Sequence, residues 1–141
     1  MRTFVALDLP PDLADDVAAL ARQLGAAVEG RFLPRSTYHL TLAFLGEVDE
    51  AQAARAGDAL DAVCANTAPV VLASDGLGKF GRAGDATLWL GIAPTRELDD
   101  LAERLRDELA SRGIPFDAKP FKPHITLARR ARISKASLPP L

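Results

Sequence analysis

The sequence has few of the residues on which several classes of site depend. Its 141 residues include a single cysteine, Cys64, and two histidines, His39 and His124. One cysteine excludes a disulfide within the chain and a zinc site built from cysteine thiolates. A lone cysteine of this kind is typically a small buried hydrophobe, which is what we expect of Cys64.

Long hydrophobic runs are also missing. No stretch approaches the ~18 consecutive apolar residues of a membrane-spanning helix. The N-terminal stretch MRTFVALDLPP has no apolar core of the kind that signal peptides carry. We therefore expect a cytoplasmic protein that makes no contact with a membrane.

Acidic residues are absent from Ala118 to the C-terminus, although the chain as a whole has a net charge of −2. Six basic residues lie in this segment, on both sides of His124: Lys119, Lys122, Arg129, Arg130, Arg132 and Lys135. Such a cluster is typical of a solvated basic tail, and it is also typical of a site for a phosphate-bearing ligand. The charges alone leave both interpretations open.

The hydrophobic pattern predicts an alternation of strands and helices. Helices are expected to begin near residues 12, 49 and 95, where apolar residues at helical spacing follow a suitable first turn. Asp49 with Gln52 matches a capping box, and Thr95 suits an N-cap. Extended segments are expected at 3–9, 31–46, 70–77, 86–92 and 116–130, with the glycine-rich GLGKFGRAGD as a link between the third and the fourth.

An internal repeat relates two parts of the chain. A shift of 85 positions brings His39 onto His124 without a gap, and it also brings the strand at 3–8 onto 88–93 and the helix at 12–24 onto 97–109. Self-similarity at a fixed offset indicates duplicated structural units.

The repeat predicts the fold class and the domain organisation. We expect one α+β domain over 1–141, with strand–helix–strand units at about 1–46 and 86–130. The expected architecture is two pseudo-symmetric lobes, each an antiparallel or mixed sheet with helices packed outside, and an active-site cleft between the lobes.

Each histidine opens the same short pattern. In YHLTLAFLG (38–46) and PHITLAR (123–129), an aliphatic residue and then Thr-Leu-Ala follow the histidine. Alternate residues of a strand share a face, so each histidine and its threonine point the same way. The expected open faces are His39, Thr41 and Ala43 in one strand and His124, Thr126 and Ala128 in the other, opposite the apolar sets Leu40, Leu42, Phe44 and Ile125, Leu127.

Several roles are open to the two histidines. A lone histidine in a strand is usually a half-buried residue with a satisfied hydrogen bond, but the repeat favours a function. A zinc site usually needs three or four protein ligands, and the only acids near the motifs are Glu47 and Asp117. A nucleophilic triad lacks a nucleophile-elbow sequence.

Acid–base catalysis at phosphorus suits the pair best. Imidazole has a reference pKa of about 6.5, so near neutral pH one ring can donate a proton while the other accepts one. In-line displacement at phosphorus needs the acid and the base on two sides of the phosphate. Threonine hydroxyls and a nearby arginine would donate hydrogen bonds to the phosphate oxygens.

These motifs together resemble the 2H phosphoesterase superfamily, and within it the RNA 2′,3′-cyclic phosphodiesterases, also called the 2′-5′ RNA ligase family. The resemblance rests on HLTL and HITL and on flanking stretches in the expected order: RTFVALDLP, YHLTLAFLGEV, GLGKFG…TLWLGI and PFKPHITLAR. It covers residues 1–132. It implies that His39 donates a proton, that His124 accepts one, and that the phosphate is held by Thr41, Thr126 and Arg129.

The resemblance also implies a reaction and a partner. Family members open a terminal 2′,3′-cyclic phosphate with water and leave a 2′-phosphate, which requires no metal or other cofactor. Such a phosphate needs a 2′-hydroxyl, which RNA has and DNA lacks. The expected protein is a monomer that acts on RNA with a cyclic-phosphate end, such as a tRNA half, or on cyclic nucleotides. Two alternatives stay open: a 2′-5′ RNA ligase or 2′-5′ phosphodiesterase at the same site, and a non-catalytic nucleotide-binding module.

Four further side chains have weaker patterns. Phe80 suits contact with a base or packing, and Lys122 suits an RNA phosphate or solvent. Tyr38 is expected to pack, and Trp89 is expected to lie in the core because its strand is otherwise apolar.

Overall fold

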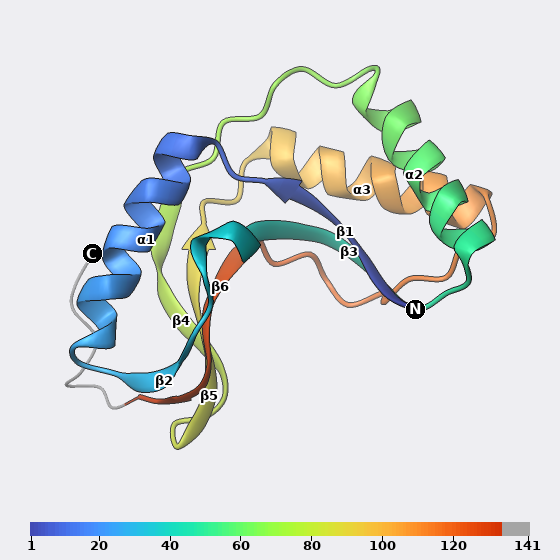
Figure 1. The fold of residues 1–141 in the computed structure, drawn as a ribbon. Coiled ribbons are helices and arrows are strands. Elements are labelled where there is room, and N and C mark those ends of the chain that lie inside the picture. The colour runs from blue at the N-terminus through green and yellow to red at the C-terminus, as the bar shows by residue number, and fades with distance from the viewer. Residues whose placement is uncertain (134–141) are drawn as a thin grey trace. The chain divides into compact units, whose positions relative to one another are not determined.

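The structure, a computed structural model, describes residues 1–133 and has the predicted α+β fold (Figure 1). The chain divides into two compact units. The first comprises Met1–Leu7, Thr41–Leu72 and Pro94–Pro123, and the second comprises Asp8–Leu40, Ala73–Ala93 and 124–133. No helix in this part of the chain is long and apolar enough to span a membrane.

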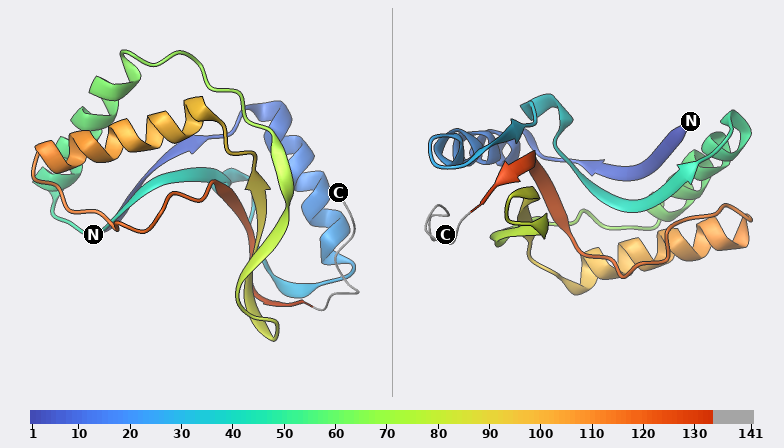
Figure 2. Two further views of the ribbon diagram at one scale, coloured as in Figure 1. Left: turned by 180° about the vertical axis from the view of Figure 1, so that it is seen from behind. Right: turned by 90° about the horizontal axis from the view of Figure 1, so that it is seen from below.

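The first unit consists of a two-stranded sheet and two helices. Its elements are β1 (Arg2–Asp8) up to Leu7, β3 (His39–Glu47) from Thr41 onward, α2 (Glu50–Cys64) and α3 (Arg96–Ser111). Strands β1 and β3 pair, and hydrogen bonds between the backbones of Met1 and Val48 show that they run antiparallel. Helices α2 and α3 lie side by side (Figures 1 and 2).

Both predicted helix caps of this unit are confirmed. The Asp49 carboxylate accepts a hydrogen bond from the Gln52 backbone at 2.7 Å, and the Gln52 side chain accepts one from the Asp49 backbone at 3.0 Å. The Thr95 hydroxyl accepts a hydrogen bond from the Leu98 backbone at 3.1 Å. These contacts satisfy backbone N–H groups that have no partner within the first turn of each helix.

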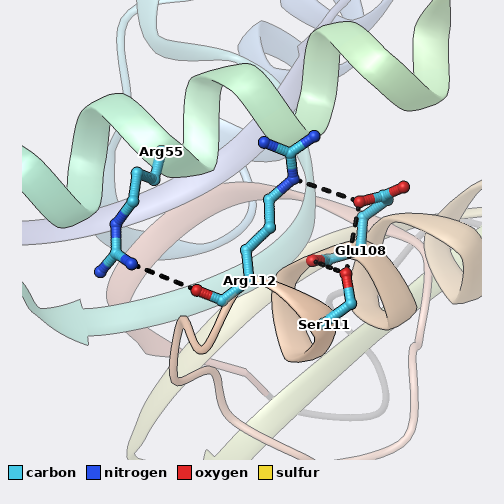
Figure 3. A network of polar contacts seen from close by, with 4 residues as sticks. All are labelled: Arg55, Glu108, Ser111 and Arg112. Atoms are coloured by element: carbon cyan, nitrogen blue, oxygen red, sulfur yellow. Dashed lines mark hydrogen bonds and ion pairs between the residues drawn. The ribbon is translucent and has the colours of Figure 1, made fainter.

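Polar contacts hold the C-terminal end of α3 against α2 (Figure 3). The Arg55 guanidinium donates a hydrogen bond to the Arg112 carbonyl at 3.2 Å, and the Arg112 side chain pairs with Glu108 at 3.2 Å. Ser111 donates to the Glu108 carbonyl at 2.9 Å. Gly113 then adopts a left-handed backbone with φ of 69°, the conformation in which helices commonly end.

The second unit is a four-stranded antiparallel sheet with one helix. The strand order is β2 (Glu29–Phe32), β6 (His124–Arg132), β5 (Asp85–Ile92) and β4 (Ser74–Arg82), and all three pairs are antiparallel. Helix α1 (Pro11–Gly25) contacts β2, and a short 3-10 turn spans Arg35–Thr37 (Figures 1 and 2). Side chains of the helix and of one sheet face form the core: Val17, Leu24, Leu88, Leu90, Ile125 and Leu127.

The alternation along β6 breaks at Leu127. The residue after it, Ala128, was expected on the open face but is fully buried, as Leu127 is. The pairing with β5 shifts on either side of the Leu88–Ala128 pair, so β6 carries extra residues there, as in a β-bulge. The same prediction for Ala43 is also wrong, because Leu42 and Ala43 are each 1% exposed while Phe44 is 47% exposed.

The glycine-rich segment is a strand rather than the predicted link. Strand β4 covers most of it, and the expected strand over 70–77 begins only at Ser74. A glycine is needed at position 78 of this strand. Gly78 is the partner of Trp89, and a Cβ there would overlap the indole ring. Glycine in a strand often marks such a close approach.

Two other predictions differ from the structure. Cys64 is exposed rather than buried, because it follows buried Val63 and therefore points about 100° away around the helix. The expected extended segment at 116–130 pairs only from His124 onward. Pro120 and Pro123 in the unpaired part have no N–H to donate to a neighbouring strand.

The two compact units do not coincide with the two repeated segments. Strands β1 and β3 of the first repeat share a unit with α3 of the second, whereas β5 and β6 of the second repeat share a unit with α1 of the first. Strands β3 and β6 have equal lengths, and their bounds differ by the same 85 positions as the histidines.

The contact between Gly78 and Trp89 predicts the effect of a small substitution. Gly78→Ala should lower the free energy of unfolding by about 1–3 kcal/mol, because the new methyl group displaces the ring. The matched control is Gly57→Ala in α2, where an added Cβ meets nothing within 4 Å. Helix propensity predicts that this control gains about 0.5–1 kcal/mol. Urea denaturation followed by circular dichroism measures both changes, and a Gly78→Ala variant as stable as the parent would contradict the packing.

Candidate active site

His39 is the first residue of β3, and its ring is tied to the turn before it. The side chain is half-buried, and Nδ1 lies 2.8 Å from the Thr37 carbonyl oxygen. A carbonyl oxygen only accepts, so Nδ1 carries the hydrogen in this contact. The ring nitrogen on the other side, Nε2, is then the one that would exchange a proton with a bound ligand.

His124 is the first residue of β6 and lies against two aromatic rings. Its ring centroid is 5.2 Å from that of Phe80, in an edge-on arrangement, and 5.8 Å from that of Trp89. The rings of Phe80 and Trp89 are themselves 5.2 Å apart. The residue opposite His124 on β5 is Gly91, where a Cβ would come within 2.6 Å of the Asp75 carbonyl oxygen.

The aromatic neighbours come from the register of three adjacent strands. Trp89 is the partner of Thr126 on one side and of Gly78 on the other, so it shares the face of the histidine. The prediction that Trp89 lies in the core is therefore wrong, because its side chain is only partly buried and contacts His124. Phe80, which is 41% exposed, occupies the same face from β4.

Thr126 and Arg129 follow His124 on the same face of β6. Thr126 lies between buried Ile125 and Leu127, so it points away from the core. Strict alternation would put Arg129 on the core face, but the bulge at Leu127 and Ala128 reverses the phase and exposes it. Three of the predicted site residues, His124, Thr126 and Arg129, thus share one face.

The remaining predicted residues differ in their surroundings. His39 belongs to the same compact unit as His124, whereas Thr41 and Lys122 belong to the other unit. Thr41 is half-buried on β3, two residues after His39, and Lys122 is exposed in the segment before β6. Tyr38 is buried, as predicted, and this burial raises the pKa of its phenol, an effect that Arg22 and Arg35 partly oppose.

The sequence patterns did not predict that an aromatic residue of the neighbouring strand contacts His124. Trp89 had no pattern to distinguish it from a core aromatic, because only the pairing of β5 with β6 puts it on the face of Thr126. Within residues 1–133, no three His, Cys, Asp or Glu side chains lie close enough together to hold a metal ion.

Comparisons with known proteins identify the family. The family model described as 2′-5′ RNA ligase superfamily matches residues 6–137. A relative from Escherichia coli K12, named RNA 2′,3′-cyclic phosphodiesterase, is 34% identical over 99% of this chain and 77% of its own length. A relative of the same name from Geobacillus stearothermophilus is 33% identical over 90% of this chain, which spans only 41% of that protein.

A comparison with solved structures indicates the same family as the two relatives. The crystal structure of E. coli LigT in apo form has a TM-score of 0.76 and 32% identity, and the match covers 99% of this chain and 77% of that one. The same protein has been solved in complex with 3′-AMP and in complex with phosphate. The chain therefore belongs to the 2′-5′ RNA ligase superfamily, the family that its two histidine motifs predict.

Proposed function

We propose that this protein hydrolyses the terminal 2′,3′-cyclic phosphate of RNA to a 2′-phosphate. The observation that carries the proposal is the face of β6 on which His124, Thr126 and Arg129 lie together, at the second of two equivalent motifs. The names of the relatives support the same substrate. A five-membered cyclic phosphate is strained, so an acid and a base suffice to open it.

The proposed reaction moves one proton at each histidine. His124 accepts a proton from the attacking water through a ring nitrogen, while the water oxygen forms a bond to phosphorus. The bond from phosphorus to O3′ breaks, and Nε2 of protonated His39 donates a proton to the departing oxygen. The products are a 2′-phosphate and a free 3′-hydroxyl, and the two rings exchange their protonation states.

The surroundings of each ring suit the role that the resemblance assigns to it. The Thr37 carbonyl holds Nδ1 of His39, so the ring is oriented and Nε2 is the atom from which the proton leaves. Phe80 and Trp89 hold the ring of His124 by contact on the sheet face. Thr41, Thr126 and Arg129 are proposed to donate hydrogen bonds to the phosphate oxygens, which gain charge in the transition state.

We also propose that residues 1–141 form one domain with an internal duplication. The matching bounds of β3 and β6 support this, as does the equivalence of α1 and α3 along the repeat. Phe80 is proposed to contact the terminal base, and Lys122 an RNA phosphate. The monomeric state, the independence of metal and the cytoplasmic location stay predictions from the sequence.

Ligation is a second candidate function, because the description of the matching family names 2′-5′ RNA ligases. Opening a cyclic phosphate with the 5′-hydroxyl of another RNA, in place of water, would form a 2′-5′ bond at the same site. Incubation with two tRNA half-molecules that carry matched ends, followed by analysis of the linkage, separates the two reactions. Binding of cyclic nucleotides with no turnover of any kind would favour a non-catalytic module instead.

The two-histidine mechanism predicts the behaviour of histidine variants. Hydrolysis of 2′,3′-cyclic AMP should proceed in EDTA and yield 2′-AMP rather than 3′-AMP, as chromatography of the products can show. His39→Ala and His124→Ala should each lower kcat/KM by about 10²–10⁴-fold, because each removes one proton-transfer group. The profile of kcat/KM against pH should be bell-shaped and should lose one limb in each variant. A strict requirement for added metal, or a 3′-phosphate product, would reject the mechanism.

The threonine on β6 gives a finer test. Thr126→Val keeps the shape of the side chain but removes the hydroxyl, and kcat should fall by about 10- to 150-fold, as expected for a lost hydrogen bond to a charged group. Thr3→Val is the matched control, since Thr3 lies on strand β1 outside both histidine motifs and its hydroxyl donates a hydrogen bond to the Met1 carbonyl. Steady-state kinetics should show little change for Thr3→Val, and equal losses in the two variants would mean that Thr126 has no special contact with the phosphate.

A further inference from the structure

Two arginines face each other across the pairing of β2 with β6. Arg31 of β2 is the Cα partner of Arg129 of β6, and both side chains are exposed. Directly opposed residues of an antiparallel pair share a face, with Cβ atoms about 4.5–5.5 Å apart. Like charges in this arrangement repel one another and destabilise the strand pair.

The neighbouring position of the same strand pair has complementary charges. Glu29 is the partner of Arg132, and their side chains form an ion pair at 3.8 Å. By contrast, no carboxylate within residues 1–133 forms an ion pair with Arg31 or Arg129. The charges of Glu29 and Arg132 thus neutralise each other, whereas Arg31 and Arg129 place two positive charges side by side. A bound anion would stabilise this second pair.

The arginine pair lies on the sheet face that carries His124. Arg129 points away from the core, on the side of Thr126, and Arg31 shares its face. The next residue of β2, Phe32, is the partner of buried Ala128 and lies near Gly25 of α1, on the opposite face. Since neighbouring strands are about 4.8 Å apart, Arg31 is one strand farther than Arg129 from β5 and its aromatic rings.

We propose that Arg31 binds the phosphodiester that joins the terminal nucleotide of the RNA to the nucleotide before it, next to the terminal phosphate at Arg129. This inference rests on the proposed function, in which Thr126 and Arg129 are near the reacting phosphate. Arg31 lies beyond Arg129 on the outer strand, so it is placed for the next phosphate of the chain. Two successive phosphates, one at each guanidinium group, offset the repulsion between the groups, and the fork of each group matches phosphate oxygens.

A binding experiment with two ligands tests this assignment. Adenosine 2′-monophosphate has only the terminal phosphate, whereas the dinucleotide ApA with a 2′-phosphate at its 3′ end also has the internal phosphodiester. Trp89, the one tryptophan of the chain, reports binding by its fluorescence because it contacts His124. Arg31→Gln should weaken dinucleotide binding by about 5- to 10-fold and leave mononucleotide binding within about twofold of the parent.

The matched control is Arg132→Gln, which removes the same charge from the same strand pair but from the ion pair with Glu29. Its affinities for both ligands should be those of the parent protein. Arg31→Gln should also reduce the slope of log affinity against log salt for the dinucleotide by about one. Without ligand, the variant should unfold at a slightly higher temperature, because one of two opposed like charges is gone.

Several results would overturn the inference. They are an unchanged dinucleotide affinity in Arg31→Gln, an equal loss in Arg132→Gln, an equal loss for the mononucleotide, and a parent protein that binds the dinucleotide no more tightly than the mononucleotide. A lower unfolding temperature for Arg31→Gln would assign the residue a structural role instead. The ligands are reaction products and binding requires no turnover, so a failure of hydrolysis rejects the proposed function and leaves this test intact.

Discussion

The face of β6 that carries the candidate site exists because the other face of the strand is buried. Ile125, Leu127 and Ala128 have no exposed surface, and their burial determines which way every other side chain of the strand points. A slip of one residue would turn His124 and Thr126 into the core, at the cost of burying polar groups without partners. Apolar packing therefore specifies the orientation of the polar residues, and the bulge adds Arg129 to the same face.

Burial also explains why the repeat and the compact units do not coincide. Strands β1 and β3 of the first repeat share a unit with helix α3 of the second, and strands β5 and β6 of the second share a unit with helix α1 and strand β2 of the first. Each compact unit thus contains elements of both repeats, so neither repeat contains a complete hydrophobic core. This interdependence favours the proposal that both histidine motifs belong to one domain.

Local sequence patterns predicted the helix caps correctly, but they did not predict the features that depend on how the strands pair. The caps at Asp49 and Thr95 depend on side chains three residues away at most, so they are visible in the sequence. The burial of Ala128 depends on a shift in register against β5, and the position of Trp89 depends on Gly78 and Thr126 as its partners. Such pairings join residues far apart in the chain, and alternation alone cannot reveal them.

The two motifs are equivalent in sequence, and each histidine ring has a contact that orients it. The ring of His39 donates a hydrogen bond from Nδ1 to a backbone carbonyl two residues earlier, and the ring of His124 contacts aromatic side chains from two other strands. A ring that donates a proton benefits from a fixed hydrogen-bond acceptor on its other nitrogen, because the acceptor stabilises the protonated form in one orientation. The contact of His39 with the Thr37 carbonyl therefore suits the role of proton donor that the proposed reaction assigns to this ring.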